Sequence, residues 1–352
     1  MDRRKHSAAS TVLEAIGKSM RTRQAISAAL VGLAIFWFFD AVPGSGQSTE
    51  LRPGAGSSAA SAIERFWAIF HRNDYSAIPA VEAELQAALA RDPENATLMA
   101  LLGATHFWHA GEYMRDPSPD LSVLQQDLPM AVQLFRSALN LDYGPHQTGY
   151  EYNDHLPGFL GVTTVHLGQS AGDPTLIQQG DQMLDYSVYQ FPEFNNFNRW
   201  AAHNADPRDS SSYQKALESL WQAIDACIGG SIDRTNPDIE PYLYLQTPVG
   251  RKSTCWSRNN MAPHSLEGLM LNLGNALVKA GQVEIAKIVY ANAKYASNYA
   301  AWPYRGVLES IAASDLTARA ALYADNDPTN DPPLAVPNRS CVYCHAKVAE
   351  AN

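Results

Sequence analysis

Residues 271–298 read LNLGNALVKAGQVEIAKIVYANAKYASN, the most regular stretch of the chain. Within it Gly274, which follows Leu273, lies twelve residues before Ala286, with another glycine between them. Steps of four, three and five residues then lead from Ala286 to Asn298. The first three of these positions share one face of a helix, and the last falls at the following turn. The stretch therefore predicts two helices joined by a turn, with Gly274 allowing them to touch closely.

The same spacing recurs three more times upstream. The three series are Val81, Leu85, Ala88 and Pro93, then Ala131, Phe135, Ala138 and Tyr143, and then Gly180, Leu184, Ser187 and Pro192. Two leucine-glycine pairs look like degenerate copies of the leading pair, and these are Leu102-Gly103 and Leu160-Gly161. We expect insertions around 115–129 and 168–177 to displace these pairs from their partner helices. Four copies of one spacing favour a repeat, and the alternative is an irregular helical bundle with coincidental spacing.

This arrangement resembles the tetratricopeptide repeat (TPR), a helix–turn–helix unit of 34 residues. The resemblance is good for 264–298, fair for 78–143 and weak for 150–228. It implies an all-α, TPR-like body over 62–325, whose stacked helix pairs would present a concave surface to a partner. We expect the last helix of this body to run from Pro303 to about Ala324.

A long loop interrupts the helical pattern over residues 229–262, where glycine and proline are frequent. Its tyrosines and tryptophan indicate that it packs against the body. Cys227 and Cys255 lie at the two ends of this region. In an exported protein they are candidates for a disulfide, which would contribute about 3 kcal/mol by the chain-entropy model. Two separate buried thiols are the alternative.

The C-terminal region, residues 326–352, begins with several prolines and is typical of a semi-rigid tether. It leads to CVYCH at residues 341–345, the Cys-x-x-Cys-His pattern of c-type haem attachment. The five-residue match resembles the c-type cytochromes. This resemblance implies one covalent haem c, with Cys341 and Cys344 bonded as thioethers to its vinyl groups and His345 as the proximal iron ligand.

Other interpretations of these cysteines stay open. Half of a structural zinc site is one, but it would need two further ligands, and only distant histidines such as His203 and His264 could be recruited. A thioredoxin-like redox pair would need a βαβ setting, which the local sequence does not offer. A chance match is the last alternative.

The second axial position of such a haem would indicate its function: a Met or His ligand there favours electron transfer, whereas an open position favours gas binding or catalysis. We favour Met261 or His264 for it, because the tether starts one helix pair away from them. The other candidates are His106, His109 and His203. Each of these residues is individually more common as a surface or core residue, and the ligand could also come from another chain.

The N-terminal region indicates export. Residues 1–24 are basic, and we expect them to form a cytoplasmic leader. Residues 25–42 form an apolar segment, whose charge-free part, 25–39, ends in aromatic residues before Asp40. Its length suits a transmembrane anchor or a signal segment, and the long leader favours the anchor. Residues 43–61 are a Gly/Ser/Ala-rich linker. The positive flank on the N-terminal side predicts a bacterial inner-membrane protein with its body in the periplasm.

The charge distribution excludes some partners. The chain carries a net charge of −10, and because residues 1–24 contribute +4, the remainder carries −14. An acidic body argues against nucleic-acid binding and suits a basic partner protein. No Ser/His/Asp order, phosphate loop or catalytic carboxylate pair stands out, so an electron carrier is favoured over a stand-alone enzyme.

These features together predict a membrane-anchored, periplasmic, mono-haem c-type cytochrome that transfers electrons. It would act as a subunit of a larger redox assembly, with a redox partner protein or membrane complex. The alternative is an exported TPR-like scaffold or binding protein whose CVYCH is a structural or metal clip. Catalysis would require a haem with an open sixth position.

Overall fold

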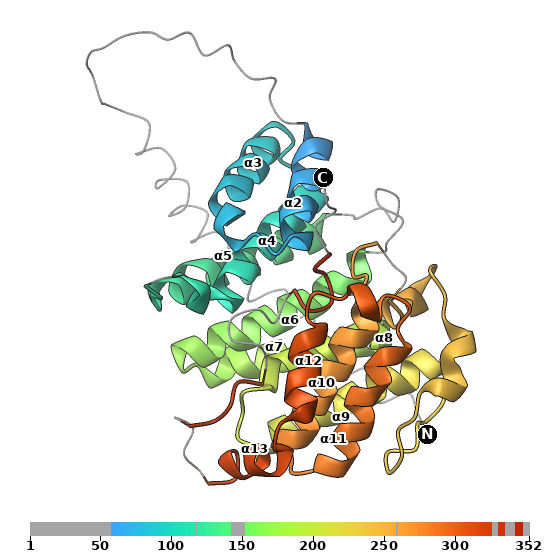
Figure 1. Ribbon diagram of the computed structural model, residues 1–352. Coiled ribbons are helices and arrows are strands. Elements are labelled where there is room, and N and C mark those ends of the chain that lie inside the picture. Colours follow the sequence, from blue (N-terminus) through green and yellow to red (C-terminus); the bar gives the residue numbers. More distant parts are fainter. Residues whose placement is uncertain are drawn as a thin grey trace, which may run out of the picture. The chain divides into compact units, whose positions relative to one another are not determined.

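Helices and short 3-10 turns provide the regular structure of the residues that the computed structural model describes, which are 58–116, 118–141, 152–257, 260–325, 330–334 and 342–347. No strand occurs among them, so the expected all-α class is confirmed (Figure 1). The predicted leader 1–24 and the apolar run 25–42 lie outside the described residues. Within the described residues, no helix combines the length and the apolar character that a membrane span needs.

Most of the helices follow one another with short connections. The α-helices are α2 (Ala59–His71), α3 (Ile78–Arg91), α4 (Ala96–Gly111), α5 (Ser122–Asn140), α6 (Tyr152–Ala171), α7 (Pro174–Gln190), α8 (Pro192–His203), α9 (Ser211–Ile228), α10 (Ser265–Lys279), α11 (Val283–Asn292), α12 (Arg305–Ala313) and α13 (Leu316–Leu322). The 3-10 segments include η2 (Tyr113–Arg115), η3 (Glu240–Leu245), η4 (Arg251–Thr254) and η5 (Ala293–Tyr295). Most helices pack on their sequence neighbours, and the pairs α4–α5, α6–α7, α8–α9 and α10–α11 are helical hairpins.

One contact recurs in three of these hairpins. A glycine of the first helix faces the second position of the four-three-five series on the second helix. If a Cβ were added to each glycine, its closest contact would be Gly103 to Phe135 Cε1 (2.9 Å), Gly161 to Leu184 Cγ (2.9 Å) and Gly274 to Tyr290 Cε1 (2.2 Å). All three partner side chains are buried. The close approach predicted from Gly274 is confirmed, and the two degenerate leucine-glycine pairs make the same contact.

The insertion expected around 168–177 is wrong. Helix α6 runs to Ala171 and α7 starts at Pro174, with only a tight turn at Gly172 (φ +63°) between them. Gly161 and Leu184 are 23 residues apart, whereas Gly274 and Tyr290 are 16 apart. One more helical turn on each side of a hairpin adds about seven residues, so the longer spacing extends both helices and keeps the contact. Around 115–129, η2 and a loop precede α5, whose first two turns already include the second half of the range.

The single helix expected from Pro303 to Ala324 is also wrong, because the chain forms α12 and α13 instead. Ser314 has an extended backbone (ψ 169°) that ends α12. The Asp315 side chain then accepts a hydrogen bond from the Ala318 amide (2.9 Å) and caps α13. Serine and aspartate favour such caps over helix interiors.

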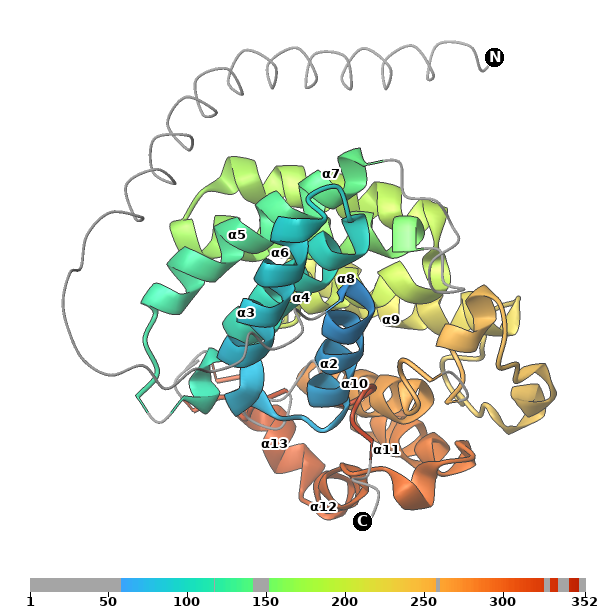
Figure 2. The same ribbon diagram turned by 90° about the horizontal axis from the view of Figure 1, so that it is seen from above.

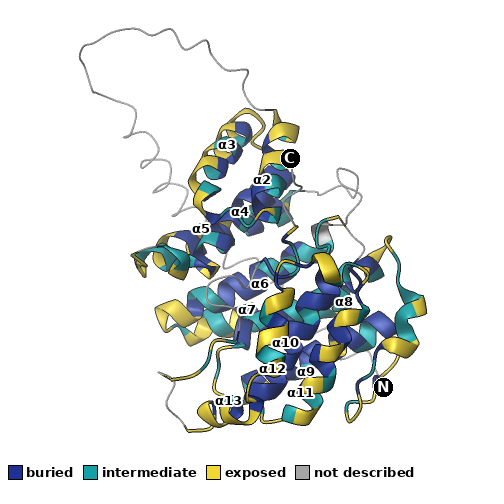
Figure 3. Cartoon of the chain, viewed as in Figure 1, coloured by how far each residue is buried: buried dark blue, intermediate teal, exposed yellow. Residues whose placement is uncertain are grey.

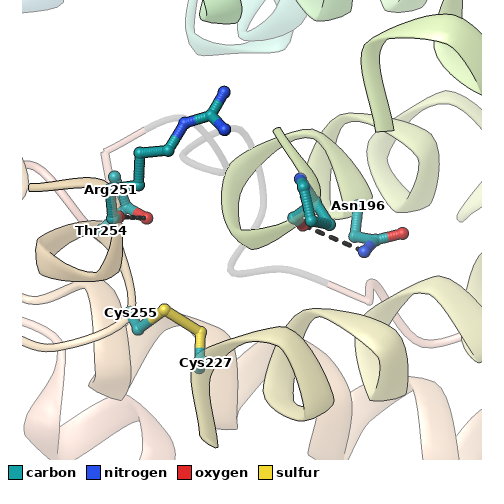
Figure 4. The surroundings of a disulfide bond; sticks show 6 residues. Asn196, Cys227, Arg251, Thr254 and Cys255 are labelled. Atoms are coloured by element: carbon teal, nitrogen blue, oxygen red, sulfur yellow. Dashed lines mark hydrogen bonds between the residues drawn. A yellow bond between two sulfur atoms is a disulfide. The ribbon is translucent and has the colours of Figure 1, made fainter. Parts of the chain in front are cut away.

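The long loop after α9 is tied to the body at several points. Cys227, at the end of α9, is joined to Cys255, just after η4, by a disulfide (Figure 4). The Arg251 guanidinium donates to Asp154 Oδ2 and to the Gln190 carbonyl, both at 2.6 Å. Trp256 is buried, as expected for a loop that packs on the body, although Tyr244 is 80% exposed.

Helix α10 is enclosed on all sides. Every one of its residues except Leu269 is buried, and α10 is almost entirely dark blue in Figure 3. Helices α9, α11 and α13 pack against it. Its polar residues are paired: Asn275 accepts from the Tyr290 hydroxyl (2.7 Å), and Lys279 donates to the Asp206 carbonyl (2.7 Å). This pairing matters because an unpaired buried polar group would be costly.

The glycine contact predicts the effect of Gly274→Ala. The added methyl group would collide with the Tyr290 ring, so we expect a loss of about 1–3 kcal/mol in unfolding free energy, typical of overpacking. Urea unfolding followed by circular dichroism measures this loss. Gly306→Ala in α12 is the matched control, since nothing lies within 4 Å of its added Cβ. Equal stability of the Gly274→Ala variant and the wild type would contradict the packing argument.

Candidate functional site

Residues 342–347, which we call the tail segment, form a turn packed on the body. The His345 and Ala346 amides both donate to the Val342 carbonyl, at 3.1 and 2.8 Å. Val342 and Tyr343 are completely buried. Cys341 lies outside the described residues.

The tail segment is held by its main chain. Three hydrogen bonds join it to the body: Trp302 Nε1 donates to the Tyr343 carbonyl (2.9 Å), the His264 amide to the Cys344 carbonyl (3.0 Å), and the Lys347 amide to the His71 carbonyl (2.7 Å). The tail segment therefore joins the C-terminus of α2 to the N-terminus of α10, and Figure 2 shows these two helices with the segment beside them.

His345 is held in one tautomer. Its Nδ1 donates to the Met261 carbonyl (2.7 Å), so Nε2 carries the lone pair. Burial lowers the pKa of His345 to about 4, so the ring is neutral at pH 7. The Phe70 ring lies 5.0 Å away and the Trp67 ring 6.5 Å away, centroid to centroid. A neutral imidazole whose other nitrogen donates to a backbone carbonyl is the form that ligates metals.

His71, which sequence reasoning missed, lies beside His345. Its Nε2 donates to the same Met261 carbonyl (3.0 Å), which is possible because a carbonyl oxygen has two lone pairs. Burial lowers the pKa of His71 to about 4. The only sequence signal for His71 was its place after the aromatic run of α2, which is equally typical of a core helix.

Cys344 is a free thiol, half-buried as a residue, and packed against α10. A Cβ added to Gly268 would lie 2.3 Å from Cys344 Sγ, so the sulfur sits directly over the glycine. Burial, and to a lesser extent the Glu267 carboxylate, raise the pKa of Cys344 to about 12. The thiol is therefore protonated at neutral pH, the opposite of a thioredoxin-like nucleophile.

A polar network lies beneath the tail segment. His264 Nδ1 is 2.9 Å from Glu267 Oε1, and the Ser257 hydroxyl donates to Glu267 Oε2. Glu267 is completely buried, and the Leu266 amide donates to Ser257 Oγ (3.1 Å). In a catalytic triad the histidine stands between serine and carboxylate. Here the carboxylate stands in the middle, so the network orients His264 and activates no nucleophile.

The structure places both favoured sixth-ligand candidates at the tail segment. Met261 contacts it through its carbonyl oxygen and His264 through its amide. His264 is buried, with its ring 6.5 Å from the Trp302 ring.

The remaining candidates have carboxylate partners elsewhere. His106 Nδ1 and His109 Nδ1 lie 2.7 and 2.6 Å from the two oxygens of Asp127. The hydrogen bond to Asp127 raises the pKa of His109. His203 lies between Asp181 (2.7 Å to Nε2) and Asp206 (2.8 Å to Nδ1). These three histidines are therefore hydrogen-bonded to carboxylates away from the tail segment.

Within the described part of the chain, no group of three or more His, Cys, Asp or Glu side chains is arranged to hold a metal ion. Cys341, which a metal clip would use, lies outside the described residues. The comparisons with known proteins gave no match: no family model, no curated protein and no solved structure resembles the chain significantly. The interpretation of the site therefore depends on its residues and their geometry.

His203 predicts a pH-dependent stability. Burial disfavours its charged form, but the hydrogen bonds to Asp181 and Asp206 outweigh this and raise its pKa to about 9. Because the pKa in the unfolded chain is about 6.5, this stabilisation is complete below pH 6.5 and is lost as the pH rises to 9.

We expect His203→Gln to lower the unfolding free energy by about 2 kcal/mol at pH 6, a typical value for hydrogen bonds to charged groups. The difference from the wild type should shrink by pH 10. Urea midpoints at both pH values measure it. His71→Gln is a comparison of opposite sign: the folded chain holds His71 neutral whereas the unfolded chain binds a proton below about pH 6.5, so this variant should gain stability relative to the wild type at pH 6 compared with pH 10. A difference that is independent of pH would refute the charged state of His203.

Proposed function

We propose that this protein is a membrane-anchored, periplasmic c-type cytochrome that carries one covalent haem at its C-terminus and transfers electrons within a larger redox assembly. His345 carries the proposal: it follows a Cys-x-x-Cys pair, is neutral, and has its proton on Nδ1, so Nε2 is ready to bind iron. Cys344 is a free thiol, as attachment requires.

The donor set fits a c-type haem. Cys341 and Cys344 would hold it through thioethers and His345 would hold its iron. Bound in this way, the haem would supply reversible one-electron transfer. Met261 and His264 are the proposed sources of a second axial ligand, because both lie at the tail segment. The chain itself fixes the His345 tautomer and excludes water from Tyr343 and Val342.

The proposed role of the helical body is to dock a partner. The glycine contact shared by three hairpins supports the TPR-like interpretation, since a repeat would place the same contact in each unit. The charge of −14 after residue 24 would steer a basic partner toward it. The Cys227–Cys255 disulfide supports an oxidising compartment such as the periplasm.

An exported TPR-like scaffold is the second candidate. The docking of the tail segment favours it, because three main-chain hydrogen bonds and a buried tyrosine can act as a purely structural clip. The two candidates differ in one property, which is covalent haem.

Haem staining separates the two candidates. In a bacterial host competent for cytochrome c maturation, we expect the full chain to keep peroxidase-active haem on a denaturing gel. Cys341→Ser and Cys344→Ser should each prevent attachment through two thioethers, and His345→Ala should lower haem content or change the iron spin state. A Cys227→Ser/Cys255→Ser chain, altered outside the motif, should still stain. A colourless full-length chain would rule out the cytochrome.

Membrane attachment is tested separately. Deleting residues 2–42 removes the predicted anchor, and we expect the truncated chain to leave the membrane fraction. As a control, the same deletion behind a cleavable signal peptide should yield a soluble periplasmic chain. Continued membrane association of this control would show that a partner, rather than residues 25–42, holds the protein.

A further inference from the structure

The tail segment protects a thiol as well as positioning a histidine. We infer that residues 342–347 form a latch: while docked on the body they shield the Cys344 thiol, and covalent modification of Cys344 requires the latch to open. This inference concerns the chain before any haem is attached. It can fail or hold independently of the cytochrome proposal.

The first element of the latch is an aromatic anchor. Tyr343 is completely buried, and its ring meets the Tyr304 ring edge-on, with centroids 4.9 Å apart. Trp302 Nε1 donates to the Tyr343 carbonyl. Asn73 in turn donates to the Tyr304 hydroxyl (2.7 Å), which ties this pocket to the segment after α2. Burial of the apolar part of this side chain stabilises the docked segment.

The second element is the glycine under the sulfur. Gly268 lies in the enclosed helix α10, and an added Cβ would meet not only Cys344 Sγ at 2.3 Å but also the Cys344 amide nitrogen at 3.3 Å and Cα at 3.4 Å. Rotation of the thiol would relieve the contact with Sγ, but the Cys344 amide nitrogen would still have to move by a few tenths of an ångström. Glycine at position 268 lets the tail segment dock at this distance without either change.

The packing explains why the docked thiol should be inert. The Cys344 sulfur lies directly over Gly268 of α10, and the Cys344 carbonyl accepts a hydrogen bond from the His264 amide (3.0 Å), so the docked segment holds the sulfur against the helix and away from an attacking reagent. A compartment that forms the Cys227–Cys255 disulfide would also oxidise an accessible thiol. A docked tail segment therefore keeps Cys344 reduced until the latch opens.

Opening of the latch would be a local event. The tail segment belongs to none of the helical hairpins. It is held by its buried residues, by the three hydrogen bonds to its main chain and by the hydrogen bond from His345 Nδ1 to the Met261 carbonyl. Segments of this kind open with a smaller free energy than global unfolding. Substitutions in the latch should therefore change thiol reactivity while the helical body stays folded.

Thiol labelling of the full chain, made without haem maturation, tests the latch. In a Cys341→Ser background Cys344 is the one free thiol, because the other two cysteines form the Cys227–Cys255 disulfide. N-ethylmaleimide adds to it by forming one S–C bond, while the thiol proton moves to the adjacent carbon, so no oxidant is needed. Mass spectrometry follows the rate. Gly268→Ala and Tyr343→Ala should each raise the labelling rate about tenfold or more. Overpacking at position 268, or loss of the Tyr343 anchor, destabilises the docked tail segment and so raises the population of the open form by about that factor.

Gly306→Ala is the matched control, as a helical glycine with open space around its added Cβ, and it should leave the rate unchanged. Circular dichroism must show the same helix content in all variants. The latch would be overturned if Cys344 of the parent chain reacted as fast as in urea. It would equally be overturned if both latch variants, folded by circular dichroism, reacted no faster than Gly306→Ala.

Discussion

The enclosure of helix α10 is the constraint on which the rest of the structure depends. A helix buried on all sides must offer close contacts in every direction and must pair every polar group it carries. Helices α9, α11 and α13 cover most of it, and Glu267, Asn275 and Lys279 each find partners inside. The C-terminal region completes the cover, since the Leu334 carbonyl accepts from Asn275 and Cys344 lies on Gly268.

Two glycines of α10 serve the same physical purpose on different faces. Gly274 admits the Tyr290 ring of α11, and Gly268, six residues earlier, admits the Cys344 sulfur. Six residues turn a helix by about 600°, so the two contacts point roughly 120° apart. The hairpin contact that builds the body and the contact that docks the tail segment are therefore compatible on one helix.

The protonation state of each of these histidines depends on its hydrogen-bond partner. His71 and His345 are half-buried, and each donates a hydrogen bond to a backbone carbonyl, so desolvation dominates and both stay neutral. His203 is buried, yet two carboxylates hold it as a cation. A neutral imidazole can bind a metal, whereas a protonated one cannot. This difference separates the proposed haem ligand from the ion-pair histidines.

The sequence by itself determined the helical class and the helix pair with its close contact at Gly274, because helix periodicity and glycine placement are local properties. It also singled out Cys344 and His345 from their spacing. It could not determine that Ser314-Asp315 divides a helix, or that longer spacings lengthen α6 and α7. The pairing of His345 with Met261, the neighbouring His71 and the seat of Cys344 on Gly268 were decided only by tertiary structure. These contacts join residues about 80 to 270 positions apart in the chain. Local sequence patterns do not predict contacts at that separation.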